Sequence, residues 1–568
     1  MSAEGRILRG TVLTVVMGGL VLPIALGLWQ TARAAFGILP ALGYDTLSLD
    51  PWRQLFALPG FWSSLRLTIV TGLGSTLLAL ALAVGFCATV HGRMTPAAGA
   101  RWLTPFLAVP HAALAVGLAF LLAPSGWIAR LVAFPLGLDR PPDLATVNDS
   151  WGLALILGLL VKEVPFLLLV ILSALSQLPV RAHVAAGRAL GYGRGVVWIK
   201  VVMPQVWPLI RLPTYAVFVY ALSVVDMAVI LGPSNPPTLA VAMTRWFMDA
   251  NPGLMLPASA AGLLHAMLAV GGIALWRLGE AATVSGGRWW VRRGGRGSSA
   301  EPTLRAATVA VTVLLTAGAL AMISLLVWSL AWRWSFPQLL PESWSLRLWS
   351  EPGRRWGPAF AVTLLLGLVT TILSLVLAIA WLEGEDRARR ARARWAEALI
   401  YLPLLVPQVA FLFGLNVVFL RFGLSGGLVA VIWVQALFVF PYVMIALSDS
   451  WRSLDPRLVS SAAALGATPL RRLLRIKLPI LLRPILTAAA IGFAVSVAQY
   501  LPTLILGAGR VTTLTTEAVT LSSGSDRRVV GVYATLQAAL PLAAYTLAFL
   551  LPAVLHRNRS ALSGPALA

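Results

Sequence analysis

The sequence has few of the residues that build reactive sites. Among its 568 residues are one cysteine, five histidines and three lysines, and charged residues make up only 11%. The cysteine, Cys87, lies within an apolar run, which excludes a disulfide framework and a thiolate metal cluster. The histidines are scattered, so each is expected to be a loop or packing residue. We therefore expect no metal site and no cofactor.

A nucleotide-binding P-loop is also absent from the sequence. Such a loop needs Gly-Lys-Ser/Thr to hold phosphates and magnesium. The three lysines, Lys162, Lys200 and Lys477, are followed by Glu, Val and Leu. The chain is therefore not expected to be an enzyme, and any ATP hydrolysis that drives it must come from a partner subunit.

Apolar residues, in contrast, are abundant. They make up 58% of the chain, and the mean hydropathy is +0.84. Runs of about twenty apolar residues, enough to cross a bilayer as a helix, recur throughout. These features predict an all-α polytopic membrane protein embedded in the lipid bilayer. The apolar run that follows Arg6 and Arg9 and reaches about Trp29 is rather long for a secretory signal, so we interpret it as an uncleaved first span.

The net charge of +23 could indicate a nucleic-acid partner. However, the arginines lie between apolar spans and show no aromatic binding pattern. We instead attribute the charge to the enrichment of Lys and Arg in cytoplasmic loops, and we expect no nucleic-acid partner.

About twelve transmembrane helices are predicted, six in each half of the chain. The first six are 10–30, 65–90, 102–123, 150–174, 206–232 and 257–277, and the second six are 306–331, 357–382, 396–420, 426–448, 484–508 and 529–555. An even number of spans per half makes the two six-helix repeats parallel in the membrane. The expected domains are a first repeat over 1–278, a basic cytoplasmic linker over 279–305 and a second repeat over 306–568. The linker is either a surface segment contacting anionic lipid or a solvated tether.

One motif occurs twice, 275 residues apart at both its glycine and its proline. Each copy is a small-residue helical segment that ends at Leu-Gly and is followed by spaced apolar residues and a proline. The first copy contains Ala185, Ala186, Leu190, Gly191, Trp198, Val201 and Pro204, and the second contains Ser460, Ser461, Leu465, Gly466, Leu473, Ile476 and Pro479. Glycine ends a helix readily, so each copy predicts a helix, a break and a second helix whose apolar residues three apart share a face. The flanking basic residues place both copies in cytoplasmic loops.

These copies resemble the two "EAA" loops of permeases of binding-protein-dependent ABC importers. The resemblance implies that each loop is a coupling helix docking into a groove on one of two ABC ATPase subunits. It also implies a periplasmic solute-binding protein as partner and a place in a bacterial inner (cytoplasmic) membrane. The family's leading glutamate is missing, because Ala185 and Ser460 stand at its two positions.

The segments after spans five and eleven carry a second resemblance. Gly232 is followed six residues later by Thr238-Leu239, and Gly507 by Thr513-Leu514. This pattern resembles the thiamine, ferric-iron and polyamine branch of these importers, and the second segment looks most like a thiamine-type fused permease. Two other classes are weighed against an importer permease: an ion-coupled secondary transporter and a membrane scaffold without transport. In either of these the two Leu-Gly loops would be a coincidence.

Ionisable groups within spans are costly and are candidates for the substrate pathway. Glu163 follows Lys162 just before Pro165, where the two charges either pair to cover backbone groups freed by the proline or line the pathway. In the resembled permeases the fifth span of each half lines the central cavity, which makes Asp226, Gln499 and Tyr500 the other candidates. A lone carboxylate there would favour a cationic solute, unless Arg211 or Lys162 pairs with Asp226.

Overall fold

The computed structural model describes residues 3–91, 96–294, 301–354, 356–388, 393–524 and 526–555. The first half contains α1 (Ala3–Val16), η1 (Met17–Val21), α2 (Leu22–Ala35), η2 (Pro40–Leu42), α3 (Asp50–Ala57), α4 (Phe61–Val90), α5 (Pro96–Ala108), α6 (His111–Leu122), α7 (Trp127–Leu136), α8 (Leu153–Leu175), α9 (Val180–Ala189), α10 (Arg194–Val197), η3 (Trp198–Val202), α11 (Met203–Ser223), α12 (Asp226–Leu231), α13 (Leu239–Phe247), η4 (Pro252–Leu254) and α14 (Met255–Arg292). The second half contains α15 (Glu301–Leu330), β1 (Ala331–Arg333), β2 (Ser343–Trp344), η5 (Pro352–Arg354), α16 (Gly357–Ala388), α17 (Arg394–Ile400), η6 (Leu402–Leu404), α18 (Gln408–Arg421), α19 (Leu428–Arg452), α20 (Pro456–Ala464), α21 (Pro469–Arg472), η7 (Leu473–Lys477), α22 (Leu478–Ile480), α23 (Leu482–Ala498), α24 (Leu501–Gly507), α25 (Leu514–Ser522) and α26 (Arg527–Leu555).

The prediction of an all-α polytopic membrane protein is confirmed. Within the described residues, ten helices are long and apolar enough to cross a bilayer, and two bent helix pairs bring the number to as many as twelve. The bent pairs are 395–404 with 408–421, at 98°, and 469–480 with 482–498, at 78°. Both pairs overlap spans expected from the sequence. The antiparallel pair β1–β2 is the one sheet in the described part of the chain.

Four of the predicted spans are interrupted, at matching places in the two halves. The third span breaks between α5 and α6 at Pro110, and its counterpart breaks before α18 at Pro407. Proline lacks an amide hydrogen and disfavours helical geometry in the preceding residue, so the break follows from the sequence. The fifth span breaks after Ser223, where Val224 is extended, and the eleventh breaks at Gln499, which is also extended. Because the bilayer core holds no water, the backbone N–H and C=O groups freed at these breaks need hydrogen-bond partners from neighbouring parts of the protein.

The basic segment between the halves is more helical than expected. The sixth span was predicted to end near residue 277, but α14 continues through Arg292. Gly294 then adopts a positive φ of 68°, and α15 begins at Glu301. The central part of the predicted linker, residues 295–300, lies outside the described residues.

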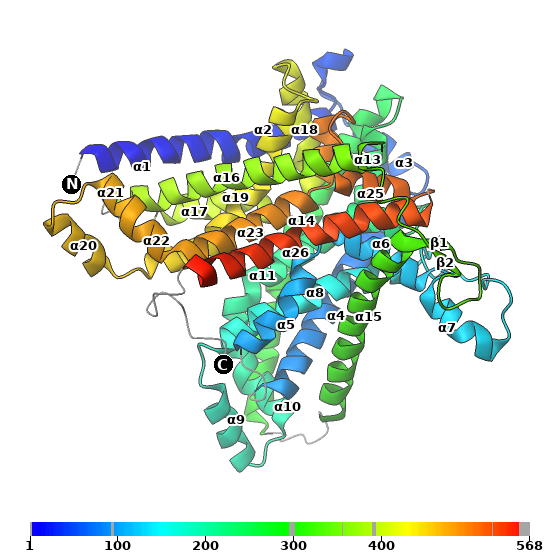
Figure 1. The fold of residues 1–568 in the computed structure, drawn as a ribbon, viewed down its shortest axis with the longest axis horizontal. Helices are drawn as coiled ribbons and strands as arrows, with labels where there is room; N and C mark the ends of the chain where they lie inside the picture. The colour runs from blue at the N-terminus through cyan, green and yellow to red at the C-terminus, as the bar shows by residue number, and fades with distance from the viewer. Residues whose placement is uncertain are drawn as a thin grey trace.

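The first span of each half packs against the other half. In Figure 1, α1 runs beside α16 and α2 beside α18, whereas α15 runs beside α4 and α6. Glycines permit these close crossings, because a Cβ added at Gly117 would collide with the Ala321 carbonyl and one at Gly414 with the Gly27 carbonyl. Gly117 and Gly414 occupy corresponding positions in α6 and α18. The two halves are therefore interlocked by an exchange of first spans.

The two copies of the repeated motif lie at separate extremities of the molecule. Figure 1 shows α20 at the left edge and α9 at the lower edge, each at the end of its own group of long helices. The short elements α7, β1 and β2 lie on the opposite side of the view. α7 lies within the loop of residues 125–150, which is longer than the corresponding loop between α18 and α19 in the second half.

Candidate coupling and substrate-pathway sites

The first copy of the repeated motif has the helix, break and second helix predicted for it. Helix α9 ends at Leu190, and Gly191 takes φ +81°, a conformation that side chains with a Cβ rarely adopt. The Gly191 amide donates to the Arg188 carbonyl at 2.9 Å, and the Tyr192 amide donates to the Gly187 carbonyl at 3.1 Å. These bonds satisfy carbonyls at the helix end in the manner of a glycine C-cap. The chain then continues through α10 and η3 into α11.

The second copy repeats this geometry. Helix α20 ends at Leu465, Gly466 takes φ +79°, and its amide donates to the Ala463 carbonyl at 3.0 Å. Side chains cap the starts of α20 and of α21, the helix after the break. Asp455 accepts from the Arg457 amide at 2.9 Å, and Thr468 accepts from the Arg471 amide at 3.3 Å. Two segments that differ in sequence therefore fold alike around the Leu-Gly pair.

Both helices offer an exposed face of small residues with a projecting leucine. Leu190 is 64% exposed and Leu465 is 87% exposed. The small residues beside them, Ala185, Ala186, Ser460 and Ser461, are also exposed. An exposed leucine on a small-residue helix is suited to docking in a groove of a partner.

The expectation that apolar residues three apart share one face is wrong for the first copy. Trp198 is 1% exposed, whereas Val201 is 37% exposed. The segment from Trp198 to Val202 is wound as a π-helix, in which residues three apart no longer align. In the second copy the corresponding segment is also a π-helix, and Leu473 and Ile476 are both half-buried. The closing prolines lie just beyond, with Pro204 exposed and Pro479 half-buried.

The first copy packs on the end of α4 through largely apolar contacts. The ring of Trp198 lies 6.0 Å from that of His91, and the Arg194 guanidinium donates to the His91 carbonyl at 3.0 Å. Burial, together with the charges of Arg181 and Arg194, lowers the pKa of His91 below its ordinary value.

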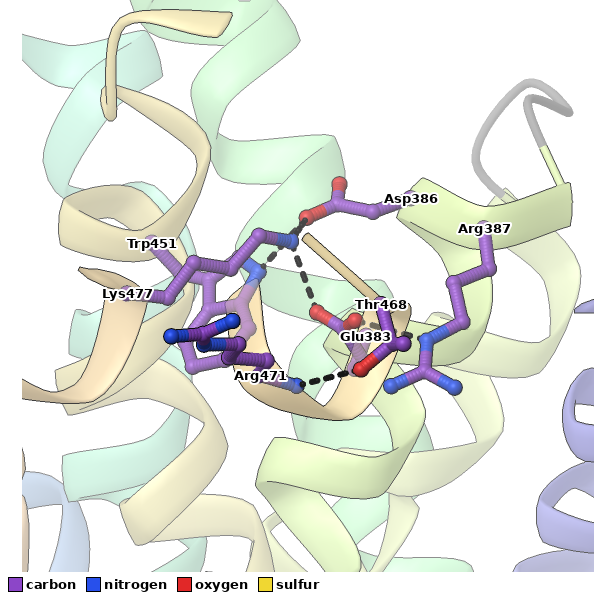
Figure 2. Close-up of polar contacts among 7 residues, drawn as sticks. All are labelled: Glu383, Asp386, Arg387, Trp451, Thr468, Arg471 and Lys477. Atoms are coloured by element: carbon purple, nitrogen blue, oxygen red, sulfur yellow. Dashed lines mark hydrogen bonds and ion pairs between the residues drawn. The ribbon is translucent and has the colours of Figure 1, made fainter. Parts of the chain in front are cut away.

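The second copy is held instead by an ionic network, which Figure 2 shows. The Lys477 ammonium donates to Glu383 at 2.7 Å and also to Asp386, both on α16. Arg387 pairs with Glu383 at 2.7 Å, and the Trp451 indole donates to Asp386 at 3.0 Å. These five residues are called the α16 network below. Sequence reasoning missed it because its charges come from segments about ninety residues apart.

Lys162 does not pair with Glu163, so the internal ion pair, one of the two interpretations left open, is wrong. The Lys162 ammonium donates to the carbonyls of Phe106 at 2.8 Å and Leu107 at 3.0 Å, and also to that of Val109. These carbonyls were freed by the break at Pro110 in the neighbouring span, not by Pro165 in the lysine's own helix. The charge thus caps the broken third span.

Glu163 is buried, and neither of its carboxylate oxygens receives a hydrogen bond from the described residues. Ser75 lies beside it, but the Ser75 hydroxyl donates to the Gly72 carbonyl at 3.2 Å. A carboxylate left without donors among apolar helices is costly, which marks Glu163 as a functional candidate.

Asp226 begins α12 at the break in the fifth span. It is buried at a helix N-terminus, where the backbone amide of Met227 can donate to its carboxylate. Of the two basic partners considered for it, Lys162 donates instead to the carbonyls at the break of the third span. Tyr500 lies at the matching break in the eleventh span. Gln499, also buried, precedes Tyr500 at that break.

The structure therefore gathers three of the four predicted pathway residues into one buried polar cluster. Two further members were missed: His111 and Tyr220, whose rings lie 4.7 Å apart. Tyr220 precedes Ser223 and Asp226 at intervals of three residues on one span, and this spacing could have indicated it from the sequence. The cluster, defined as His111, Lys162, Glu163, Tyr220, Asp226 and Tyr500, draws on both halves of the chain. We call it the buried polar cluster.

Comparison with known proteins gives the class to which this fold and these loops belong. Residues 376–558 match the family described as "binding-protein-dependent transport system inner membrane component". The inner membrane ABC transporter permease protein YnjC of Escherichia coli K12 is 33% identical over 532 residues, which cover 92% of this chain and 94% of that protein. The protein is thus a multi-pass inner membrane permease.

Shorter similarities point the same way. The spermidine/putrescine transport system permease protein PotC homolog of Mycoplasma genitalium is 26% identical over 28% of this chain and 58% of its own length. The molybdenum transport system permease protein ModB of Mycobacterium tuberculosis is 29% identical over 27% of this chain and 64% of its own length. The chain belongs to the family of ABC-type permeases of binding-protein-dependent transport systems, and its relatives are transport proteins rather than enzymes.

Proposed function

We propose that the chain is the transmembrane permease of an ABC importer, with two permease repeats fused in one polypeptide. A periplasmic solute-binding protein delivers a small solute, and two separate ATPase subunits supply the energy. The observation that carries the proposal is the pair of exposed Leu-Gly helices with matching left-handed glycines. Two such helices in one chain offer one docking site for each of two ATPase subunits.

The composition of the docking helices bears on how the ATPase binds. Where the resembled loops have a glutamate, α9 has Ala185 and α20 has Ser460, and both are exposed. An ion pair through that position is therefore not available to this chain. We infer that docking depends on the projecting Leu190 and Leu465 and on the surrounding arginines.

A displacement of the first docking loop can be transmitted to the buried polar cluster through one continuous helical segment. Residues 194–223 form one helical rod through α10, η3 and α11, and the rod ends at the break that carries Asp226. Rigid elements of this kind transmit displacement between sites. Closure of the ATPase subunits on ATP would thus reposition the fifth span and open or close the pathway.

Co-purification tests this proposal directly. When the chain is expressed with its own operon and isolated by an affinity tag in mild detergent, ATPase subunits with a P-loop are expected to accompany it in a 2:1 ratio. Leu190→Glu combined with Leu465→Glu should abolish that association, because a charge replaces the apolar contact at both sites. Leu47→Glu, at an exposed loop position before α3, serves as the control for nonspecific loss. Isolation of the chain without any ATPase, in conditions where transport is active, would refute the proposal and favour an ion-coupled transporter.

The charge balance of the buried polar cluster favours a cationic solute. Glu163 and Asp226 supply two carboxylates, whereas Lys162 supplies one ammonium that already serves the broken third span. Aromatic side chains of His111, Tyr220 and Tyr500 complete the cluster. Carboxylates and aromatic rings suit a thiamine-like compound, a polyamine or an iron ion. The names of the relatives include both cationic polyamines and molybdenum, so the charge argument rests on the cluster alone.

Uptake by Asp226→Asn checks the cargo proposal. In cells carrying the whole operon, the variant is expected to lose about tenfold in uptake of the cationic solute, since one charge contact in a desolvated site contributes on the order of 1.4 kcal/mol. Asp226→Glu, which keeps the charge, should retain most of the activity. Labelled thiamine, putrescine and iron are the solutes to compare. Normal uptake by Asp226→Asn, or identification of an anionic cargo, would contradict the electrostatic argument and leave the importer assignment intact.

A further inference from the structure

The α16 network lies where the second coupling helix meets the long spans. The side chains of Lys477 and Glu383 are each only 5% exposed, so this charge pair is buried. Lys477 belongs to η7, which follows the docking helix α20 and the short helix α21. Glu383 belongs to the last turns of α16 (Figure 2). A buried pair fixes one geometry, because moving either charge away leaves the other without compensation.

Further contacts join the same end of α16 to its neighbours. Arg452, at the end of α19, pairs with Glu385 at 3.0 Å and also with Glu397 of α17. The Trp381 indole donates to Glu385 at 3.1 Å. α1 crosses this end closely, since a Cβ added at Gly384 would lie 3.2 Å from the backbone of Arg9. The end of α16 is thus a junction of η7, α17, α19 and α1.

In the described residues of the first half, the positions that match Lys477 and Glu383 carry no charge. Val202 stands 275 residues before Lys477, and Ala88 stands 295 residues before Glu383, the separation that also relates Thr68 to Thr363. Both Val202 and Ala88 are buried and apolar.

The two halves also differ in how the docking helix continues. In the first half the helix runs from Arg194 to Ser223 as a single span. In the second half the chain bends by 78° at Leu481, between α22 and α23. A bend of this size interrupts transmission along the helix axis, and the α16 network lies on the docking side of it.

We propose, on the basis of the importer function above, that Lys477 is a positioning residue that couples the second ATPase site to α16. Through Glu383 and Asp386 it makes α20, η7 and the end of α16 move as one unit, and α16 carries the movement past the bend. The first site transmits through its continuous helix instead. The two ATPase subunits therefore drive the permease through different mechanical connections.

The test uses the full complex of permease, ATPase and binding protein reconstituted in proteoliposomes. Lys477→Met is expected to keep the bound ATPase and its basal hydrolysis but to lose about tenfold in stimulation by the solute-loaded binding protein. Lys477→Arg, which can reach both carboxylates, should keep the stimulation. Arg305→Met, at an exposed position in the first turns of α15 and outside both docking loops, is the control and should behave as wild type.

The outcomes separate this inference from the proposed function. Stimulation of Lys477→Met within twofold of wild type would overturn the role of Lys477. So would a loss that Lys477→Arg shares with Lys477→Met, because it would indicate a packing defect rather than a charge connection. Absence of ATPase from the wild-type complex would instead refute the importer function itself.

Discussion

Replacing Gly191 or Gly466 with valine is expected to uncouple ATP hydrolysis from transport. Each glycine ends a docking helix at a φ near +80°, where a β-branched residue costs roughly 1–2 kcal/mol or more. A Cβ at Gly466 would meet nothing within 4 Å, so the penalty is one of backbone conformation and not of crowding. The chain relieves it by turning α20 away from its present direction, and the ATPase contact is lost. Transport should fall at least about tenfold per site, as expected when more than about 1.4 kcal/mol of coupling is removed.

The measurement is solute uptake and ATP hydrolysis in the same proteoliposomes. Gly286→Val is the matched control, because Gly286 lies in the interior of α14 with open space around it and without a positive φ. Gly466→Asn should be milder than Gly466→Val, since asparagine tolerates the left-handed region. Unchanged transport in both valine variants would show that the Leu-Gly turns do not set the docking geometry.

Replacing Lys162 with methionine is expected to destabilise the whole permease. The ammonium serves three backbone carbonyls at the break of the third span, and methionine fills similar space without a donor. Hydrogen bonds to a charged group contribute about 1.5 kcal/mol or more each, so the variant should lose on the order of 4 kcal/mol of unfolding free energy. In the apolar interior of the membrane, no water is available to replace the lost hydrogen bonds to these carbonyls.

Thermal unfolding in detergent, followed by size-exclusion chromatography, checks this expectation. Lys200→Met is the control, because Lys200 belongs to η3 and its ammonium lies 4.3 Å from the centre of the Trp290 ring. The control should unfold close to the wild-type temperature, whereas Lys162→Met should unfold well below it. Equal unfolding temperatures for the two variants would contradict the capping role.

Features governed by local chemistry were predictable from the sequence. Long apolar runs gave the spans, and the Leu-Gly pairs gave the turns that end α9 and α20. The break at Pro110 coincides with a residue that cannot continue a helix. Each of these depends on residues that are neighbours along the chain.

Features governed by contact between distant segments were not predictable in the same way. Lys162 was expected to pair with the adjacent Glu163, but its acceptors lie more than fifty residues earlier, in a span that the fold brings beside it. Lys477 meets Glu383 across 94 residues. The π-helical winding of both coupling segments also escaped the sequence, because it depends on how each segment meets the long spans.

The exchange of first spans has a consequence for biosynthesis. Gly27 of α2 is among the first residues to enter the membrane, yet its neighbours Phe411 and Gly414 are synthesised almost 400 residues later. Until then α2 must wait in lipid with its contact face uncovered, and α6 must likewise wait for α15. Neither half can reach its final packing on the ribosome alone. Because both halves belong to one polypeptide, each α2 and α6 is supplied with its partners α18 and α15 in equal number and in the same place. The packing of the first half is finished only when the second half inserts.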